Sequence, residues 1–263
     1  MNKKYALITG SSSGIGLDIA QELASRGYNI VLTARREERL KNITAQLIAD
    51  FGVDADYVVA DLGESNAPGT IFNFCSSNNY EVDILVNNAG YTINKQFHEI
   101  SEEEEERFLR VLGLAAIALT KRFIPGMLEQ KSGKIMLVSS LAAFAPPARG
   151  ALYGPVKTYV NRFGEALNLN YRSQGITATN VCPGFVKTEF HSANGMQDVM
   201  DKLPSFMKKD SKAVAKGAVD AMISGKYLWI PGLLVKMIAF FCYHLPASLV
   251  IKVGSGLAGG RYD

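Results

Sequence analysis

Cysteine and histidine are scarce in this chain, which has three of each among 263 residues. They are Cys75, Cys182, Cys242, His98, His191 and His244. The cysteines are too widely spaced for a disulfide framework or a metal knuckle, and no histidine pairs with acidic residues at the spacing of metal ligands. We therefore expect no metal site and a reducing environment.

The chain also lacks a large net charge of either sign. The chain carries 28 basic and 25 acidic residues, a net charge of +3, and it has no basic block or basic-aromatic stripe. This composition argues against a nucleic acid partner. The acidic run from Glu102 to Glu106 follows Ser101, and we interpret it as the first turn of a helix, where an N-cap serine and acidic side chains suit the helix dipole.

The nearly continuous apolar stretch near the C-terminus is short for a membrane-spanning helix. The charge-free stretch 237–251 has only fifteen residues and contains Pro246, whereas a spanning helix needs about 20 residues. The apolar C-terminal extension, residues 232–263, is expected to pack on a subunit or a lid, with peripheral membrane contact as the second alternative and a spanning helix as a distant third. The apolar run 5–8 near the amino terminus ends directly in a glycine loop, so we interpret it as a buried strand rather than a signal peptide. We expect a cytoplasmic protein, with membrane association left open.

Short apolar segments alternate with amphipathic helical patterns, and 48% of the residues are hydrophobic, enough for a sizeable core. Strands are predicted near residues 5–9, 29–33, 56–60, 83–86, 134–139 and 177–182. Helices are predicted from the glycine loop to Ala24 and near residues 36–50, 101–127 and 151–171. Buried strands separated by helices imply right-handed crossovers and a parallel sheet.

The predicted fold class is therefore α/β. We expect one doubly wound Rossmann-type domain, residues 1–263, with a mainly parallel sheet of roughly seven strands and helices on both faces. No internal repeat or linker divides the chain. Residues 190–225 are expected to form a substrate lid and the helix that follows it.

The first predicted strand leads into the glycine loop Thr9-Gly10-Ser11-Ser12-Ser13-Gly14-Ile15-Gly16. Its glycines carry no side chains, so the backbone can approach a pyrophosphate, and the following helix directs N–H groups at it. Such a turn can also be purely structural, but this one opens an alternating chain. We expect a dinucleotide to be bound by Gly10, Ser12, Ser13, Gly14, Ile15 and Gly16.

Two further segments follow the ends of predicted strands, where ligands bind in open parallel sheets. Asp61 and Leu62 follow the third strand, and the carboxylate is placed to meet an adenine. Asn88, Ala89 and Gly90 follow the fourth strand, where small residues let the backbone approach a cofactor. We expect all five residues to bind the dinucleotide.

The end of the second strand predicts which dinucleotide binds. An acidic residue there would bond the ribose 2′-hydroxyl and repel a 2′-phosphate, but the chain has Ala34 followed by Arg35 and Arg36. An arginine presents a bidentate fork to a phosphate. We expect NADP(H), read by Arg35 with a loop serine, with Arg36 adding charge. NAD(H) stays open, because two exposed arginines can also simply begin a charged helix.

Tyr153 and Lys157 lie four residues apart, which places both on one face of a helix. A tyrosine ionises near pH ~10, and a fixed ammonium nearby lowers its pKa. Such a phenol can give a proton to a carbonyl or take one from an alcohol. Ser139 and Ser140 end the strand predicted at 134–139, beside the expected nicotinamide. A Tyr-x-x-x-Lys pair alone would be an ordinary solvated helix face, but not together with the glycine loop and the serine.

These motifs stand in the order of the short-chain dehydrogenase/reductase family, which the chain resembles over roughly residues 4 to 190. The resemblance implies that Ser140 orients the substrate carbonyl, while turn capping fits Ser139 better. It also implies that Tyr153 donates the proton and that Lys157 holds the nicotinamide ribose and lowers the tyrosine pKa, so both contact the cofactor. The residues implied to bind the carboxamide are Pro183, Gly184, Val186 and Thr188.

Two positions depart from the family pattern. Pro155 stands where alanine or serine is usual, which is tolerable in the first turn of a helix beginning near Ala151. Leu112 stands where the family commonly has an asparagine that anchors a water of the proton relay. Leucine cannot anchor that water. Either a backbone carbonyl or solvent serves instead, or proton resupply is slow, or the protein binds NADPH without efficient turnover.

The sequence thus predicts an NADP(H)-dependent oxidoreductase that reduces the ketone or aldehyde of a medium-sized apolar substrate, or oxidises the corresponding alcohol. A 3-oxoacyl thioester reductase is the alternative among enzymes. An NADPH-binding sensor or scaffold with weak catalysis is the alternative from another class. The expected partners are the small apolar carbonyl or alcohol substrate and further copies of the chain in a homodimer or homotetramer.

Overall fold

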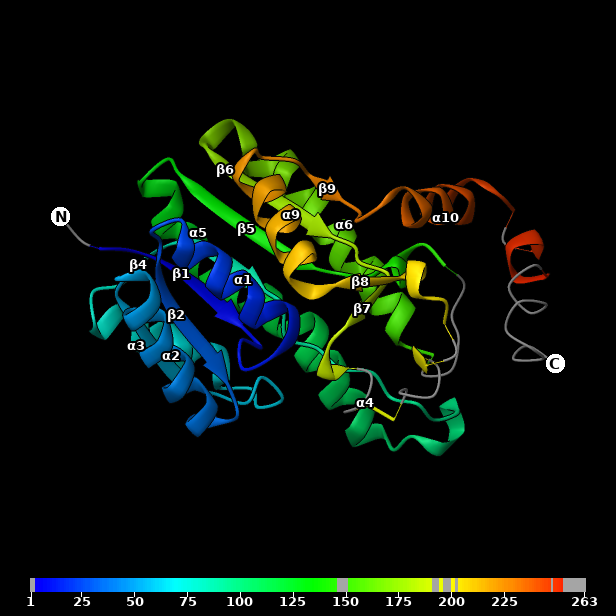
Figure 1. Ribbon diagram of the computed structural model, residues 1–263, viewed down its shortest axis with the longest axis horizontal. Helices are drawn as coiled ribbons and strands as arrows, with labels where there is room; N and C mark the ends of the chain where they lie inside the picture. The colour runs from blue at the N-terminus through cyan, green and yellow to red at the C-terminus, as the bar shows by residue number, and fades with distance from the viewer. Residues whose placement is uncertain are drawn as a thin grey trace.

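The structure, a computed structural model, describes residues 3–145, 151–190, 194–195, 200–201, 203–246 and 248–252. The strands of its main sheet are β1 (Lys4–Thr9), β2 (Asn29–Ala34), β3 (Ala55–Val59), β4 (Glu81–Asn87), β5 (Gly133–Val138), β6 (Ile176–Val181) and β9 (Leu228–Trp229). These seven strands lie in the order β3-β2-β1-β4-β5-β6-β9, and every neighbouring pair is parallel (Figure 1). The predicted α/β fold with a seven-stranded parallel sheet is confirmed.

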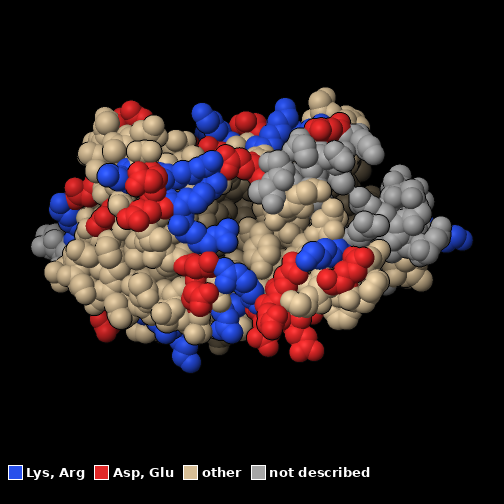
Figure 2. Space-filling model, turned by 90° about the horizontal axis from the view of Figure 1, so that it is seen from below, with Lys and Arg blue, Asp and Glu red and all other residues tan. Residues whose placement is uncertain are grey.

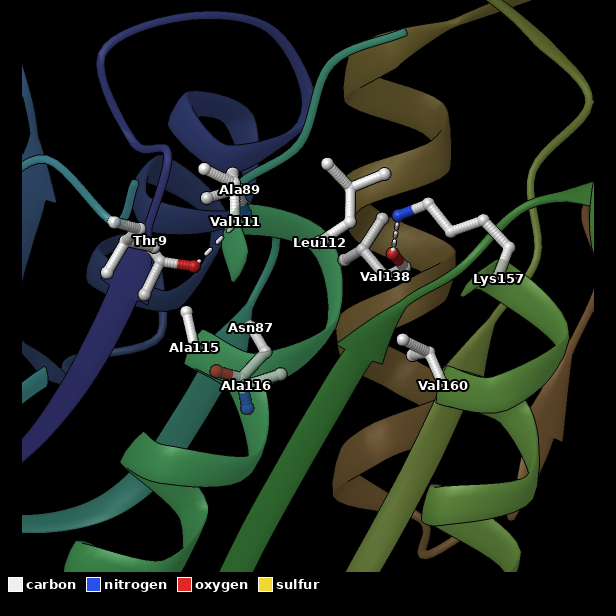
Figure 3. A pocket seen from close by; sticks show the side chains of 11 residues that line it. Thr9, Asn87, Ala89, Val111, Leu112, Ala115, Ala116, Val138, Lys157 and Val160 are labelled. Atoms are coloured by element: carbon white, nitrogen blue, oxygen red, sulfur yellow. Dashed lines mark hydrogen bonds between the residues drawn. The ribbon is translucent and has the colours of Figure 1, made fainter. Parts of the chain in front are cut away.

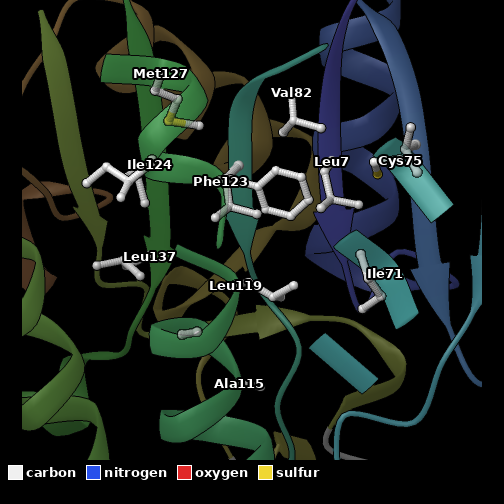
Figure 4. Close-up of a cluster of buried hydrophobic side chains, with 14 of the residues drawn as sticks. Leu7, Ile71, Cys75, Val82, Ala115, Leu119, Phe123, Ile124, Met127 and Leu137 are labelled. Carbon is white, nitrogen blue, oxygen red and sulfur yellow. The ribbon is translucent and has the colours of Figure 1, made fainter. Parts of the chain in front are cut away.

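Helices cover both faces of the sheet and bury its apolar strands (Figure 1). One face is covered by α1 (Gly14–Ser25), α2 (Glu37–Phe51) and α9 (Ser211–Ile223). The other face is covered by α3 (Ala67–Ser77), α5 (Ala115–Glu129) and α6 (Tyr153–Tyr171). On this second face Leu119 and Phe123 of α5 share a core cluster with Leu7 of β1 and Ile71 of α3 (Figure 4).

The order of strands reverses between β1 and β4. The chain moves outward through β2 and β3 on one side and through β5 and β6 on the other. Ligands bind outside the carboxyl ends of strands at such a switch point. A second, two-stranded sheet of β7 (Phe185–Lys187) and β8 (Lys208–Asp210) follows β6 in the chain.

The acidic run begins a helix, as predicted. The Ser101 hydroxyl accepts the N–H of Glu104 at 3.2 Å, and α4 (Glu102–Leu109) has four glutamates in its first turn. The single helix predicted for residues 101–127 is interrupted, however, by a π-helical turn, η2 (Arg110–Leu114), before α5 begins. Such turns insert an extra residue into a helix and are frequent at functional sites. Here the turn contains Leu112.

The combined helix from Glu102 to Glu129 is long and apolar enough, by length and composition alone, to cross a membrane. Half of its most apolar window is nevertheless buried inside the protein, because α5 packs on the sheet. Its apolar character is therefore explained by the core.

The C-terminal extension includes the apolar helix α10 (Leu233–His244), which projects beyond the sheet (Figure 1). Val235 and Ala239 are buried, whereas Leu233 and Phe240 are 75% and 57% exposed. A helix that is apolar on all sides is normally covered. The homodimer or homotetramer, and the membrane contact, stay predictions. Residues 253–263 lie outside the described part of the chain.

Much of the expected lid also lies outside the described residues, namely 191–193, 196–199 and 202. The helix expected to follow the lid is α9, which packs against α1. It begins after Asp210, whose carboxylate accepts the N–H of Ala213 at 3.1 Å and caps the helix.

Gly164 lets α6 approach β6 closely, because a Cβ there would lie 2.2 Å from Oδ1 of the buried Asn180. Asn180 is itself held by a 2.8 Å hydrogen bond from its Nδ2 to the carbonyl of Asn161. We expect Gly164→Ala to lower the free energy of unfolding by about 1–3 kcal/mol, the usual effect of overpacking. Denaturant titration measures it. Gly126→Ala is the control, since Gly126 is also helical but has nothing within 4 Å of its Cβ position. It should be neutral or stabilising by up to ~1 kcal/mol, and equal losses in both variants would contradict this explanation.

Candidate active site

The loops after β1 and β4 are bonded together at the switch point. The Thr9 hydroxyl accepts the N–H groups of Asn88 and Ala89 at 2.9 and 3.0 Å. The Asn88 amide donates to the carbonyls of Thr9 and Gly10 at 2.9 and 3.2 Å. Asn88, predicted to bind the cofactor, therefore holds the glycine loop in place. Thr9 does the same, although the sequence analysis did not select it as a site residue.

The geometry of the loop requires its glycines. Gly10 and Gly14 have φ angles of 65° and 57°, which other residues rarely adopt. A Cβ at Gly16 would lie 2.3 Å from the Asn88 amide nitrogen and 2.5 Å from the Gly10 carbonyl. Helix α1 begins at Gly14 without an acidic residue in its first turn and without a capping hydrogen bond from the Ser13 side chain. Its N–H groups and dipole therefore fit the pyrophosphate of a dinucleotide.

Arg36, which was expected only to add charge beside Arg35, contacts the loop serines. Its Nη2 donates to the hydroxyls of Ser12 and Ser13 at 2.9 and 2.8 Å. Arg36 is the N-cap residue of α2, so it sits where the chain turns from strand to helix. Arg35 is exposed, and its positive charge contributes to lowering the pKa of Asp61.

Asp61, expected beside the adenine, is held by protein groups. Its carboxylate accepts Nη2 of Arg107 at 2.5 Å and the N–H of Gly63 at 2.9 Å. Burial acts to raise the pKa of Asp61, but these hydrogen bonds keep it below its usual value. An ionised carboxylate has about four acceptor positions, so an adenine contact stays compatible with this arrangement. Leu62 and Ile15, also predicted to bind the cofactor, are buried and half-buried.

Ser140, Tyr153 and Lys157 come together where β5 ends and α6 begins. Tyr153 and Lys157 lie in the first turns of α6, which has Pro155 in its first turn as expected. The Ser140 hydroxyl lies near enough to the Tyr153 phenol to act on its pKa. The Lys157 ammonium lies 5.7 Å from the centre of the Tyr153 ring.

The two serines after β5 differ from expectation in one respect. Ser139 is buried, and its hydroxyl donates to the carbonyl of Lys157 at 2.9 Å. The Ser140 hydroxyl accepts the N–H of Ala142 at 3.1 Å and so caps the short turn η3 (Leu141–Ala143). Turn capping, which we expected of Ser139, thus belongs to Ser140, while Ser139 fastens α6 to β5.

Burial decides the protonation of both titratable groups. It raises the pKa of Tyr153, and the nearby Ser140 hydroxyl opposes this. It lowers the pKa of Lys157 to about 8, although the ammonium donates to the Val138 carbonyl at 2.9 Å. The expectation that Lys157 lowers the pKa of Tyr153 is therefore wrong for this arrangement. The ammonium lies over the ring, and burial disfavours the charged form of both groups.

Leu112 lies beside Lys157, where the missing relay asparagine was expected. The Leu112 Cγ and the Lys157 Nζ are each 3.6 Å from the Cβ position of Gly90. Leu112, Lys157 and Asn87 line a cavity of about 10 Å³, roughly the size of one water molecule (Figure 3). Oδ1 of the buried Asn87 has no hydrogen-bond partner in the described part of the chain. The cavity therefore offers a water both space and polar groups, even though Leu112 offers it no hydrogen bond.

The segment after β6 closes the site from the other side. Pro183 and Val186 are buried, and Gly184 lies against α10. The Thr188 Cβ is 3.2 Å from the Cβ position of Gly14. The predicted carboxamide-binding segment thus reaches the glycine loop.

Aromatic and aliphatic side chains surround the tyrosine. The Tyr153 ring centre lies 6.5 Å from that of Phe108 and 6.5 Å from that of Phe190. Ile93, Phe108, Leu112 and Val156 form a buried cluster against which Tyr153 packs. The site is therefore apolar around its phenol.

The fold and the site together define a dinucleotide-dependent oxidoreductase with a Ser-Tyr-Lys centre. The chain belongs to the short-chain dehydrogenase family, since the family model described as short chain dehydrogenase matches residues 4–198. The resemblance inferred from the sequence is confirmed.

Relatives and solved structures share this family. The chain is 28% identical over 221 residues to a very-long-chain 3-oxoacyl-CoA reductase of Anas platyrhynchos, covering 82% of this chain and 67% of that protein. It is 33% identical over 187 residues to the inactive hydroxysteroid dehydrogenase-like protein 1 of Homo sapiens, covering 70% of this chain and 56% of that protein. The chain thus spans about two thirds or less of the length of these relatives. A short-chain dehydrogenase from Sphingobium yanoikuyae, solved in complex with NADPH, is 27% identical with a TM-score of 0.81, covering 97% of this chain and 94% of that one.

The buried ammonium of Lys157 should make stability depend on pH. Its pKa is about 8 in the folded chain and 10.5 for an ordinary lysine, so the unfolded chain binds more protons between these values. The free energy of unfolding contributed by this group therefore rises with pH across that window. The thiols of Cys75 and Cys182, whose pKa values are raised to about 12 and about 11, act in the opposite direction above pH 9.0.

Comparison with Lys157→Met cancels the titration of Cys75, whereas the titration of Cys182 is coupled to Lys157 and enters the difference above pH 9.0. We expect the free energy of unfolding of the native chain, minus that of the variant, to grow as the pH rises from below 8 toward 10.5. Denaturant titrations at a series of pH values measure this difference. A difference that does not change with pH would contradict burial as the cause of the lowered pKa.

Proposed function

We propose that this protein is an NADP(H)-dependent reductase that converts the ketone or aldehyde carbonyl of a medium-sized apolar substrate into an alcohol. The observation that supports this most is the grouping of Ser140, Tyr153 and Lys157 at the carboxyl end of β5, beside the glycine loop. The reverse reaction, oxidation of the alcohol, uses the same groups.

Four features support NADP(H) as the cofactor. The second strand ends in Ala34, so no carboxylate repels a 2′-phosphate there. Arg36 is hydrogen-bonded to Ser12 and Ser13, and together the three side chains form a cationic, hydroxyl-rich site that suits a phosphate. The similar Sphingobium protein was solved with NADPH. Basic side chains also gather beside the hollow seen in Figure 2.

The residues of the chain divide the remaining work. NADPH, when bound, supplies the hydride that reduces the carbonyl carbon. Tyr153 donates its proton to the carbonyl oxygen, because its raised pKa keeps the phenol protonated. The Ser140 hydroxyl, which lies near the phenol, is placed to orient the same oxygen. Lys157, buried behind the ring, is the nearby group that can return a proton to the phenol.

The apolar surroundings support an apolar substrate. Phe108 and Phe190 flank the Tyr153 ring, and Val235 of α10 lies against Gly184. A charged group placed here would lose its hydration without a partner.

Two alternatives have specific support. A 3-oxoacyl thioester reductase is favoured by the similarity to the very-long-chain 3-oxoacyl-CoA reductase. An NADPH-binding protein with weak catalysis is favoured by Leu112 and by the similarity to a relative described as inactive. Turnover on ketones and on 3-oxoacyl thioesters separates the three proposals.

Tyr153→Phe should reduce NADPH-dependent carbonyl reduction by about 10²–10⁴-fold, because it removes the proton donor. NADPH binding, followed by fluorescence, should change little, since the ring is kept. Tyr159→Phe is the control: Tyr159 lies on the same helix but is 44% exposed. Equal turnover in native protein and Tyr153→Phe would rule out the proposed proton donor.

Leu112→Asn tests whether the missing asparagine limits turnover. Because the cavity beside Lys157 already offers room and polar groups to a water, we expect the steady-state rate to stay within about twofold. The free energy of unfolding should fall by about 1–3 kcal/mol, since an amide replaces a side chain that is 3% exposed. Leu112→Met, a volume-conserving change, is the control for packing. A large rise in turnover with asparagine would instead support the weakly catalytic alternative.

A further inference from the structure

Arg36 and Arg39 at the start of α2 bind the carboxylate of Glu189, an anionic side chain of the same protein. Nη1 of Arg39 donates to both carboxylate oxygens of Glu189, at 3.1 and 2.9 Å, and Nη1 of Arg36 lies 3.3 Å from one of them. Glu189 is 153 residues away from Arg36 in sequence, so this contact is made by the fold and not by a helical turn. The Arg39 guanidinium, followed by that of Arg36, holds the pKa of Glu189 below its usual value.

Arg36 joins this carboxylate to the glycine loop. Its Nη2 and Nε bond Ser12 and Ser13, while its Nη1 faces Glu189. Two arginines thus hold a carboxylate, and one of them is also bonded to two hydroxyls, an arrangement that would equally suit a phosphate monoester. The side chains of Arg36, Arg39 and Glu189 are 43%, 48% and 54% exposed, so a ligand from solvent can reach the group.

We propose that Glu189 is an internal competitor for the phosphate-binding arginines, and that Arg39 is a third residue of the 2′-phosphate site beside Arg36 and the loop serines. A 2′-phosphorylated nucleotide must displace the carboxylate from Arg36 and Arg39 before it can pair with them. A nucleotide without that phosphate displaces nothing. Glu189 therefore lowers the preference for NADP(H) over NAD(H), and this inference rests on the proposed function.

The position of Glu189 gives this competition a further consequence. Its neighbour Thr188 lies against Gly14, and its other neighbour Phe190 lies against the Tyr153 ring. Three consecutive residues thus touch the pyrophosphate loop, the phosphate-reading arginines and the catalytic tyrosine. If Glu189 moves away from the arginines, its neighbours Thr188 and Phe190 would shift against Gly14 and the Tyr153 ring.

The test compares adenosine 2′,5′-bisphosphate with 5′-AMP by calorimetry on the full chain, because the two ligands differ only in the 2′-phosphate. Glu189→Gln should bind the bisphosphate roughly two- to fivefold more tightly than the native protein, as expected for the loss of an exposed competing charge. Its affinity for 5′-AMP should stay unchanged. Arg39→Gln should weaken bisphosphate binding, and Glu189→Gln should have a smaller effect in that background. The differences should shrink at high salt.

Glu165→Gln is the matched control. Glu165 is also exposed and ion-paired, with Arg162 on the same helix, so the variant has the same change of charge away from the site. If it strengthens bisphosphate binding equally, the effect is one of net charge and the proposal is overturned. Unchanged binding of the bisphosphate in Glu189→Gln also overturns the proposal, because Glu189 would then not compete for the arginines. Weaker binding overturns it too, because Glu189 would then position the arginines for the phosphate.

The same titrations separate this inference from the proposed cofactor preference. A native protein that prefers the bisphosphate, with no effect of Glu189→Gln, leaves the preference intact and removes only the competitor. If neither protein prefers the bisphosphate, both proposals fail. If the preference emerges only in Glu189→Gln, the competitor is supported and the preference of the native chain for NADP(H) is not.

Discussion

A buried ammonium bonded to the end of a strand organises this site. Lys157 donates to the Val138 carbonyl of β5, and its own carbonyl accepts the hydroxyl of Ser139. Strand and helix are thus joined at two points, by bonds that run in opposite directions. Burying an ammonium is unfavourable, and its lowered pKa expresses that penalty. In return the first turn of α6 is fixed, so that Tyr153 stands against Ser140. The grouping of Ser140, Tyr153 and Lys157 therefore depends on how β5 and α6 are joined.

The features that were predicted from the sequence are those whose residues lie close together in the chain. Strand and helix periods gave the sheet, and the glycine loop and the Tyr-x-x-x-Lys pair gave the two halves of the site, because each is contained within a few residues. Contacts across long separations were missed. Arg107 reaches Asp61 across 46 residues and Arg39 reaches Glu189 across 150, and no periodic pattern marks such pairs. The π-helical turn at Leu112 was also missed, since its apolar residues suit an α-helix equally well.

Protonation was the property that spacing predicted least well. A lysine one turn after a tyrosine suggests an acidified phenol, but spacing says nothing about how deeply the pair is buried. Burial favours the neutral form of each group, so it raises the pKa of Tyr153 and lowers that of Lys157. The same limitation applies to Arg35 and Arg36. Both are charged and adjacent, and only the turn into α2 decides which of them bonds the serines.

The charge states of Tyr153 and Lys157 suit the proton transfer that the proposed reduction requires. A phenol with a raised pKa is protonated near neutral pH, which is the form required to protonate a carbonyl oxygen. A lysine with a pKa of about 8 is still mainly protonated there, yet it loses its proton more readily than an exposed lysine. It can therefore return a proton to the phenol and be reprotonated from a water in the adjoining cavity. Oxidation of an alcohol would instead require the phenolate, which burial disfavours. The burial of Tyr153 and of Lys157 thus agrees with the reductive direction that we propose.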